Sequence, residues 1–356
     1  MRMREIVPEY IITGIESRKS SVPSREMEKI FYDEVRDFDA EPYFNAYKKW
    51  HGEGAPPEYS RIPEYLVEKE ITVAGLQKLI NVFEKDLPFG IFSCYIGIFI
   101  SYLGNELCDD NVMDLHTSDR IFNLAYCNSH KTWIINGPSG ACLGEYMSGG
   151  KIIVNGNAYN SLGEAMRGGK IIVNGDVDNN AGIRMSGGSM LIRGDAGCQA
   201  GCDMNGGMIE IRGNAAGSMG AKMQGGKIKV MGSVGNNCGM YMQGDEILVM
   251  GNAGKHAGRG MEGGLIRIVG DSGRYSGHAM SGGELVIEGN ADDDVGGEMK
   301  GGKIWIGGEM GKICKRINGG EIYHRDAMVY PAGMERIARD AAAAKDSLLK
   351  RLWHSK

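Results

Sequence analysis

The 356-residue sequence lacks several features that would assign it to a common class of protein. It has no basic excess, with 40 Lys and Arg against 45 Asp and Glu, so nucleic-acid binding has little electrostatic support. The first residues, from Met1 to Glu5, lack the apolar stretch of a secretory signal peptide. The eight cysteines are scattered among apolar corners and flanks. This distribution suits reduced thiols and predicts a cytoplasmic protein.

Long apolar runs are also absent. The segment from Leu87 to Leu103 is mostly apolar, but it falls short of the ~20 residues that a membrane-spanning helix requires. It contains Pro88, Gly90 and Gly97. We therefore predict a buried element of an N-terminal domain here rather than a membrane helix.

Glycine is abundant, at 56 residues, and it belongs to a repeat. Nine methionines lie nineteen residues apart, each opening a Met-x-Gly-Gly cassette that is broken only by Asp245. A fixed period of this length is typical of stacked structural repeats. The methionines are Met147, Met166, Met185, Met204, Met223, Met242, Met261, Met280 and Met299.

Each cassette is followed by two apolar positions separated by one residue. Because residues two apart on a strand share a face, both positions are predicted to point into one core. The first series is Trp133, Ile152, Ile171, Met190, Ile209, Ile228, Ile247, Ile266, Leu285 and Ile304. The second is Ile135, Val154, Val173, Ile192, Ile211, Val230, Val249, Ile268, Ile287 and Ile306.

Nineteen residues per repeat predict three short strands joined by glycine corners, stacked as parallel strands. The period is not a multiple of six and no sixth-residue aliphatic is kept, which favours a right-handed parallel β-helix over a left-handed one. We expect about ten turns between roughly residues 131 and 323.

The recurring G-x-I-x-I-x-G and G-x-x-x-M-x-G-G pattern resembles the GXGXG family. Members of that family include the β-helical subunit of formylmethanofuran dehydrogenase and the C-terminal domain of the glutamate synthase large subunit. The resemblance implies a non-catalytic scaffold subunit of a redox complex, with no cofactor of its own. Its partner subunits would carry molybdopterin or tungstopterin and iron–sulfur clusters, or flavin and an iron–sulfur cluster. A separately encoded glutamate synthase domain is the first alternative, and a stand-alone β-helix hydrolase or acyltransferase is the second.

The sequence divides into residues 1–125, a mixed or helical cap, residues 126–325, the β-helix, and residues 326–356, a C-terminal helix. In the cap, apolar residues at helical spacing predict a helix from Thr72 to Glu84, with Thr72 as its N-cap. Residues 37–63 read as an extended arm. The segment from Gly333 to Leu352 alternates Ala, charged and apolar residues, which predicts one amphipathic helix.

No motif in the sequence predicts a catalytic, cofactor-binding or metal-binding residue. No serine lies in a G-x-S-x-G elbow, and the G-x-G-x-x-G match at Gly258 to Gly263 precedes a predicted strand rather than a helix. Cys198 and Cys202 lack the second pair that a metal or iron–sulfur site requires. His256 and His278 lie one repeat plus three residues apart, so we expect them to be unstacked surface residues. The single acidic triplet at Asp292 to Asp294 is predicted to be a solvated corner rather than a calcium site.

Between the two inward positions of each repeat lies one that points outward. Its apolar members are candidate interface residues: Ile134, Ile153, Ile172, Leu191, Leu248, Val286 and Trp305. A stacked apolar stripe of this kind marks an interface. We expect the cap to cover the first four, and Leu248, Val286 and above all Trp305 to contact a different subunit.

Overall fold

The structure is a computed structural model that describes residues 46, 62, 70–86, 92–118 and 121–330. All of these residues belong to one compact unit, Glu41–Lys356. The predicted arm at residues 37–63 and the predicted helix at residues 333–352 fall outside the described residues, apart from Ala46 and Ile62.

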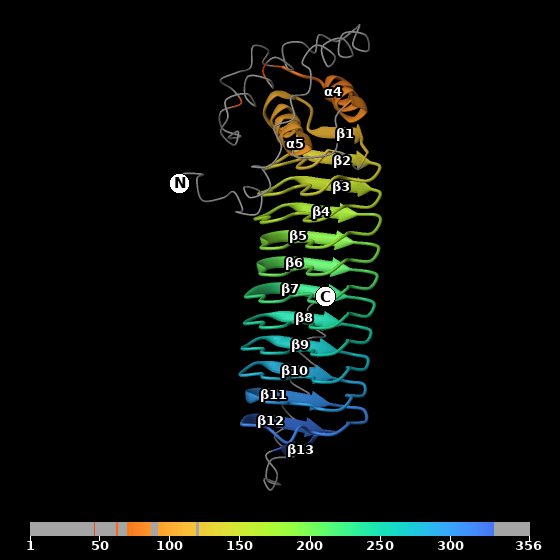
Figure 1. Cartoon of the computed structure of the whole chain (residues 1–356). Helices are drawn as coiled ribbons and strands as arrows, with labels where there is room; N and C mark the ends of the chain where they lie inside the picture. Colours follow the sequence, from red (N-terminus) through yellow and green to blue (C-terminus); the bar gives the residue numbers. More distant parts are fainter. Residues whose placement is uncertain (1–45, 47–61, 63–69, 87–91, 119–120, 331–356) are drawn as a thin grey trace, which may run out of the picture. The chain divides into compact units, whose positions relative to one another are not determined.

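A single thirteen-stranded sheet dominates the unit, and its strands follow one another in sequence order (Figure 1). All neighbours pair in parallel except β12 and β13, which pair antiparallel. The strands are β1 Val112–His116, β2 Thr132–Asn136, β3 Lys151–Asn155, β4 Lys170–Val173, β5 Ser186–Ile192, β6 Asn205–Ile211, β7 Gly225–Val230, β8 Glu246–Val249, β9 Leu265–Ile268, β10 Glu284–Ile287, β11 Lys300–Ile306, β12 Gly319–His324 and β13 Ala327–Tyr330. The predicted β-solenoid is confirmed.

The strands stack in register, so equivalent residues of successive repeats become neighbours. Ile152 pairs with Ile171 and Ile171 with Met190, each nineteen residues further along. Every member of the two inward series is at most 2% exposed, and the nine methionines are fully buried. The core is therefore a set of continuous ladders inside the stack, as the period predicts.

Each turn contains one strand rather than the three that we predict from the repeat length. A second ladder consists of single-residue bridges, running from Ser139 through Ala158 and onward to Met310. The remaining side is a series of tight turns with left-handed φ at alternate residues, such as Ser161 (60°), Gly163 (63°) and Ala165 (52°). Their amides donate alternately to the next and the previous turn, so the hydrogen-bond ladder continues without an extended strand.

Glycine is required where the turns approach the core. At Gly182, φ is +64°, and an added Cβ would lie 2.6 Å from Cδ1 of Ile209. Asp245 stands where the other cassettes have their second glycine, and it keeps the left-handed φ of 57°. Its Oδ2 accepts a hydrogen bond at 2.6 Å from the Gly226 amide of the preceding turn, which helps to hold the aspartate in place.

Helices cover the N-terminal end of the stack. Helix α4 (Val73–Asp86) begins after Thr72, whose Oγ1 accepts a hydrogen bond from the Gly75 amide, so the predicted N-cap is confirmed. The Gln77 side chain accepts from the His116 amide and donates to the His116 carbonyl, which ties α4 to the edge strand β1.

The apolar segment that we considered as a membrane helix forms α5 (Phe92–Tyr102) and the π-helical turn η3 (Leu103–Leu107). Phe99 and Ile100 are fully buried, and Asn105 accepts a hydrogen bond from the indole of Trp133 in β2. The prediction of a buried element is confirmed. Of the helices that the structure describes, none is long and apolar enough to cross a membrane.

The parallel ladder extends beyond the regular repeat at both ends. Val112 in β1 pairs with Thr132, twenty residues later, and Ile304 in β11 pairs with Ile322, eighteen residues later. Eleven strands from β2 to β12 therefore form the stack, with β1 added in front of them. The repeat does not predict β1, because its spacing departs from nineteen.

Candidate interaction surface

The outward side of the sheet is built from the residues that alternate with the core ladders. The predicted interface residues lie on it in one column, since Ile134, Ile153, Ile172 and Leu191 pair in register on β2 to β5. The column continues through Glu210, Lys229, Leu248, Arg267, Val286 and Trp305. All its members are half-buried except Lys229, which is exposed. Their stacking is thus confirmed, whereas their contacts with a cap or another subunit stay a prediction.

A second outward column lies two residues further along the chain, where the central strands end, and it carries two exposed apolar side chains. Met231 is 42% exposed and Met250 on the next turn is 38% exposed. Val269 follows on the third turn and is half-buried. Sequence reasoning overlooked this column because only these three of its members are apolar. Their period of nineteen would have revealed it.

A third column, two residues before the first, mixes apolar and charged side chains. Met208 in β6 is 47% exposed, and Leu265 in β9 is half-buried. Between them, Lys227 and Glu246 form an ion pair at 3.3 Å across β7 and β8. Two further ion pairs join the first column to the second: Glu210 pairs with Arg212 at 3.1 Å, and Arg267 pairs with Glu288. We call the outward side of β5 to β10 the central sheet face.

Trp305 differs from the rest of its column because one ring face is already covered. Its ring stacks on Tyr323 of β12 with centroids 3.8 Å apart and planes at 10°. Tyr323 is 4% exposed and donates to Glu321, and its burial raises the pKa of the phenol. The stack therefore fixes the Trp305 ring while the residue as a whole is half-buried, as an anchor residue would be.

Polar residues reinforce the turns through a side-chain ladder that the sequence analysis did not identify. The Oδ1 of Asn157 accepts from the Asp176 amide, and Asp176 accepts in turn from the Asp195 amide, nineteen residues later. The same bond recurs through Asn214, Ser233, Asn252, Asp271 and Asn290 to the Glu309 amide. These residues satisfy backbone donors at a corner, so they are structural.

Residues 135–279 match the GXGXG motif family. They belong to the GXGXG family. The matched segment begins inside β2 and ends after β9, and β10 to β12 continue its register beyond the match. Comparison of the chain with curated proteins gives no match.

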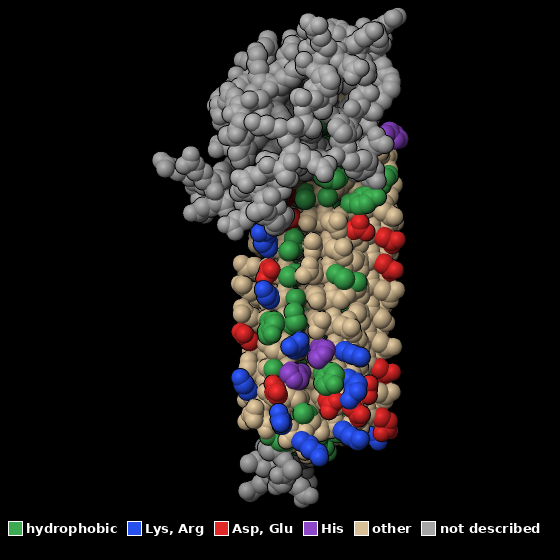
Figure 2. Space-filling model, in the orientation of Figure 1, with side chains coloured by type: hydrophobic (Ala, Val, Ile, Leu, Met, Phe, Trp, Pro, Cys, Tyr) green, Lys and Arg blue, Asp and Glu red, His purple; other side chains and the backbone are tan. Residues whose placement is uncertain are grey.

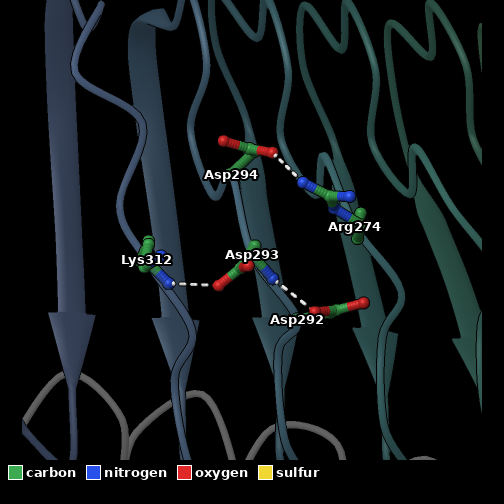
Figure 3. A network of polar contacts seen from close by, with 5 residues as sticks. All are labelled: Arg274, Asp292, Asp293, Asp294 and Lys312. Carbon is green, nitrogen blue, oxygen red and sulfur yellow. Dashed lines mark hydrogen bonds and ion pairs between the residues drawn. The ribbon is translucent and has the colours of Figure 1, made fainter.

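The acidic triplet from Asp292 to Asp294 lies beyond the matched residues, at a corner held by hydrogen bonds and an ion pair (Figure 3). Asp293 accepts a hydrogen bond from the Lys312 amide at 2.9 Å, and Asp292 accepts one from the Asp293 amide at 2.7 Å. Asp294 forms an ion pair with Arg274 of the preceding turn at 2.7 Å. The three carboxylates point to different partners, so they do not converge on a common ligand.

His256 and His278 lie closer together than we expect from the sequence. Their rings meet edge to face at 6.2 Å, and Tyr275 stacks on His256 at 4.8 Å. Figure 2 shows histidines among acidic and basic side chains in this half of the domain. Burial, followed by the charge of Arg259, lowers the pKa of His256. Within the described residues, no three His, Cys, Asp or Glu side chains are grouped so as to hold a metal ion.

Two carboxylates are buried on the turns near the N-terminal end. Glu145 and Glu164 are 5% and 1% exposed. Asn123 donates to Glu145, and Arg184 forms an ion pair with Glu164. Burial, reinforced by the negative charge of Glu164, raises the pKa of Glu145 to about 8. Nothing in the sequence pattern indicated this pair, because the repeat position holds unrelated residues in the other turns.

Cys198 and Cys202 both carry free thiols, and they differ in exposure. Cys198 is exposed, whereas Cys202 is buried, with its Sγ 3.4 Å from a carboxylate oxygen of Asp203. Burial raises the pKa of Cys202 to about 11, so this thiol is protonated at neutral pH and is a poor nucleophile.

Proposed function

We propose that the chain is a non-catalytic structural subunit of a cytoplasmic, multi-subunit redox enzyme, similar to the β-helical subunit of formylmethanofuran dehydrogenase. The GXGXG solenoid would hold neighbouring catalytic subunits in position. Those partners would supply the chemistry through molybdopterin or tungstopterin and iron–sulfur clusters.

The observation that carries this proposal is the outward side of the sheet. The core ladders occupy the inward positions, yet Met208, Met231 and Met250 still expose 38–47% of their surface on the outward side. Scattered exposed apolar residues are ordinary, but Met231 and Met250 are aligned on neighbouring turns, and such an alignment indicates a surface that binds protein. Trp305 at one end of the sheet is the strongest candidate anchor, because it is rigid and half-exposed.

The test is purification of the tagged chain from its native cells, followed by mass spectrometry of the proteins that accompany it. We expect stoichiometric subunits of a redox enzyme. Replacing Trp305 with alanine should reduce their recovery at least ~10-fold, while the isolated chain stays folded and loses only the ring stack on Tyr323, about 0.5–1.5 kcal/mol. Tyr241→Ala is the matched control, since Tyr241 is an exposed aromatic residue on the turns rather than on the sheet.

The identity of the partners separates the proposal from its alternatives. Subunits with a pterin support a formylmethanofuran dehydrogenase-like complex, and subunits with a flavin and a glutaminase support a glutamate synthase. Recovery of the chain without any partner, together with hydrolase or acyltransferase turnover by the isolated chain, would contradict the scaffold role.

A further inference from the structure

On the central sheet face, residues on one side of the midpoint between β7 and β8 are complementary in charge to the residues at equal distance on the other side. Glu210 on β6 and Arg267 on β9 occupy the same outward column, at equal distances from the midpoint between β7 and β8. Lys227 and Glu246 occupy another column on either side of the same midpoint. Opposite charges thus lie at matching positions in the two halves of the face.

From this order we infer that the central sheet face binds the same face of a second copy of this chain. The two solenoids run antiparallel, related by a two-fold axis that lies parallel to the strands between β7 and β8. In this arrangement β7 faces β8 of the second copy, β6 faces β9 and β5 faces β10. Each side chain faces the equivalent position of its partner strand.

The innermost strands bring together a charge quartet and an apolar contact. Lys227 faces Glu246 of the second copy, and each already forms an ion pair with the other within its own chain at 3.3 Å. The four charges therefore alternate in sign around the axis. Met231 faces Met250 of the second copy, and this contact buries the two most exposed apolar side chains of the second column. Lys229 faces Leu248, which its aliphatic stem can cover.

The outer strands continue the match. On β6, Glu210 faces Arg267 and Met208 faces Leu265 of the second copy. Leu191 on β5 faces Val286 on β10, and just past the ends of these strands Arg193 faces Glu288. At most positions from β5 to β10, apolar residues thus meet apolar residues and acids meet bases. The exceptions are Lys229 and Arg212, whose aliphatic stems face Leu248 and Val269, and Ser189, which faces Glu284. Trp305 on β11 lies outside this face and stays available to another subunit.

Other arrangements of the same two faces place like charges together. With the solenoids parallel, each strand faces itself, so that Glu210, Lys229 and Arg267 each meet their own copies. Centring the antiparallel axis on β7 opposes Lys229 to Lys229, and centring it on β8 opposes Glu246 to Glu246. Like charges facing each other across an interface disfavour association. The antiparallel arrangement with its two-fold axis between β7 and β8 avoids all of these like-charge contacts.

The size of the face sets the expected affinity. Six strands about 4.8 Å apart span only about 29 Å along the stack. This is at the small end of specific interfaces, which bury at least about 1,200 Å² in total. We therefore expect reversible self-association in the micromolar range, with long-lived dimers only at high concentration.

The experiment is sedimentation equilibrium of the purified full chain over a range of concentrations. The average mass should rise from 38.6 kDa towards twice that value as concentration increases. Lys227→Glu opposes like charges at two places around the axis and should weaken the dimer at least ~10-fold. The double variant Lys227→Glu/Glu246→Lys restores both the pair within the chain and the pair between copies, so it should dimerise like the parent. Lys151→Glu, on the same side of the sheet but outside the central face, is the control and should change nothing.

A mass that stays at 38.6 kDa up to about 100 µM overturns the inference and leaves the face to a different subunit. Failure of the double variant to recover dimerisation, while its melting temperature equals that of the parent, also overturns it. The inference rests on the proposed function only in treating the outward side of the sheet as a binding surface. It assigns Met208, Met231 and Met250 to a second copy and leaves Trp305 as the anchor for other subunits. Because the experiment uses the purified chain alone, its outcome is separate from the search for catalytic partners.

Discussion

Replacing Ile211 with aspartate would place a carboxyl group in the middle of the core. Ile211 is fully buried in β6, where it pairs with Ile192 on one side and Val230 on the other. Removing its side chain forfeits about 1.5–3 kcal/mol of apolar burial. A carboxyl group without a partner costs at least about 2 kcal/mol more. We therefore expect the free energy of unfolding to fall by about 4 kcal/mol or more.

The measurement is urea and thermal unfolding followed by far-UV circular dichroism, with Asn205→Asp as a control at an exposed position of the same strand. Burial should raise the pKa of the new carboxyl group, so the folded state keeps its proton at a pH where the unfolded state has lost it. The destabilisation should then grow as pH rises from about 4 towards that raised pKa. If the Ile211→Asp protein unfolded like the parent and the control, the assignment of this ladder to the core would be refuted.

Three further predictions concern single positions. Ile153→Lys should lower the melting temperature of the isolated chain if the cap covers the first outward residues, and an unchanged melting temperature would mean that this residue faces solvent. The pKa of Glu145, raised to about 8, implies that the parent loses stability as pH rises from about 5 to 8. Glu145→Gln should abolish this loss in unfolding experiments. If the variant and the parent showed the same pH dependence, the burial of this carboxyl group would be contradicted. Gly182→Ala should lower the free energy of unfolding by at least about 1 kcal/mol, because φ is +64° and the new Cβ would meet Ile209. Gly217→Ala, at a residue without positive φ, should lower it by less. Equal losses in urea unfolding would show that the turn at Gly182 tolerates a side chain.

The position of each core residue could be predicted from the sequence. Ile152 and Val154 repeat every nineteen residues with one residue between them, and only a strand buries both on one face. The methionine series behaves in the same way, because each Met occupies the same place in its turn. The outward column of Ile153 and its equivalents follows from the same alternation.

The path of the chain between the strands could not be predicted in this way. A period states how far apart equivalent residues lie, and it does not state how nineteen residues divide between strands and turns. Ser161 and Ala165 adopt left-handed conformations that a strand would exclude, which reduces three predicted strands to one. His256 and His278 meet for the same reason, since three residues of tight turn cover much less distance than three residues of strand.

The sequence by itself determined that this protein is a stack of repeats with a core of apolar ladders, because an apolar residue that recurs at every turn must find the same environment in each. Only the tertiary structure decided how much of each outward side chain stays exposed and which side chains of the turns meet. Met231 and Met250 are nineteen residues apart in the chain and adjacent on the sheet, and Glu145 gains its raised pKa from burial and from a carboxylate one turn away. The exposure of these methionines and the pKa of Glu145 depend on which side chains of the neighbouring turns pack against them, and the nineteen-residue period does not specify that packing.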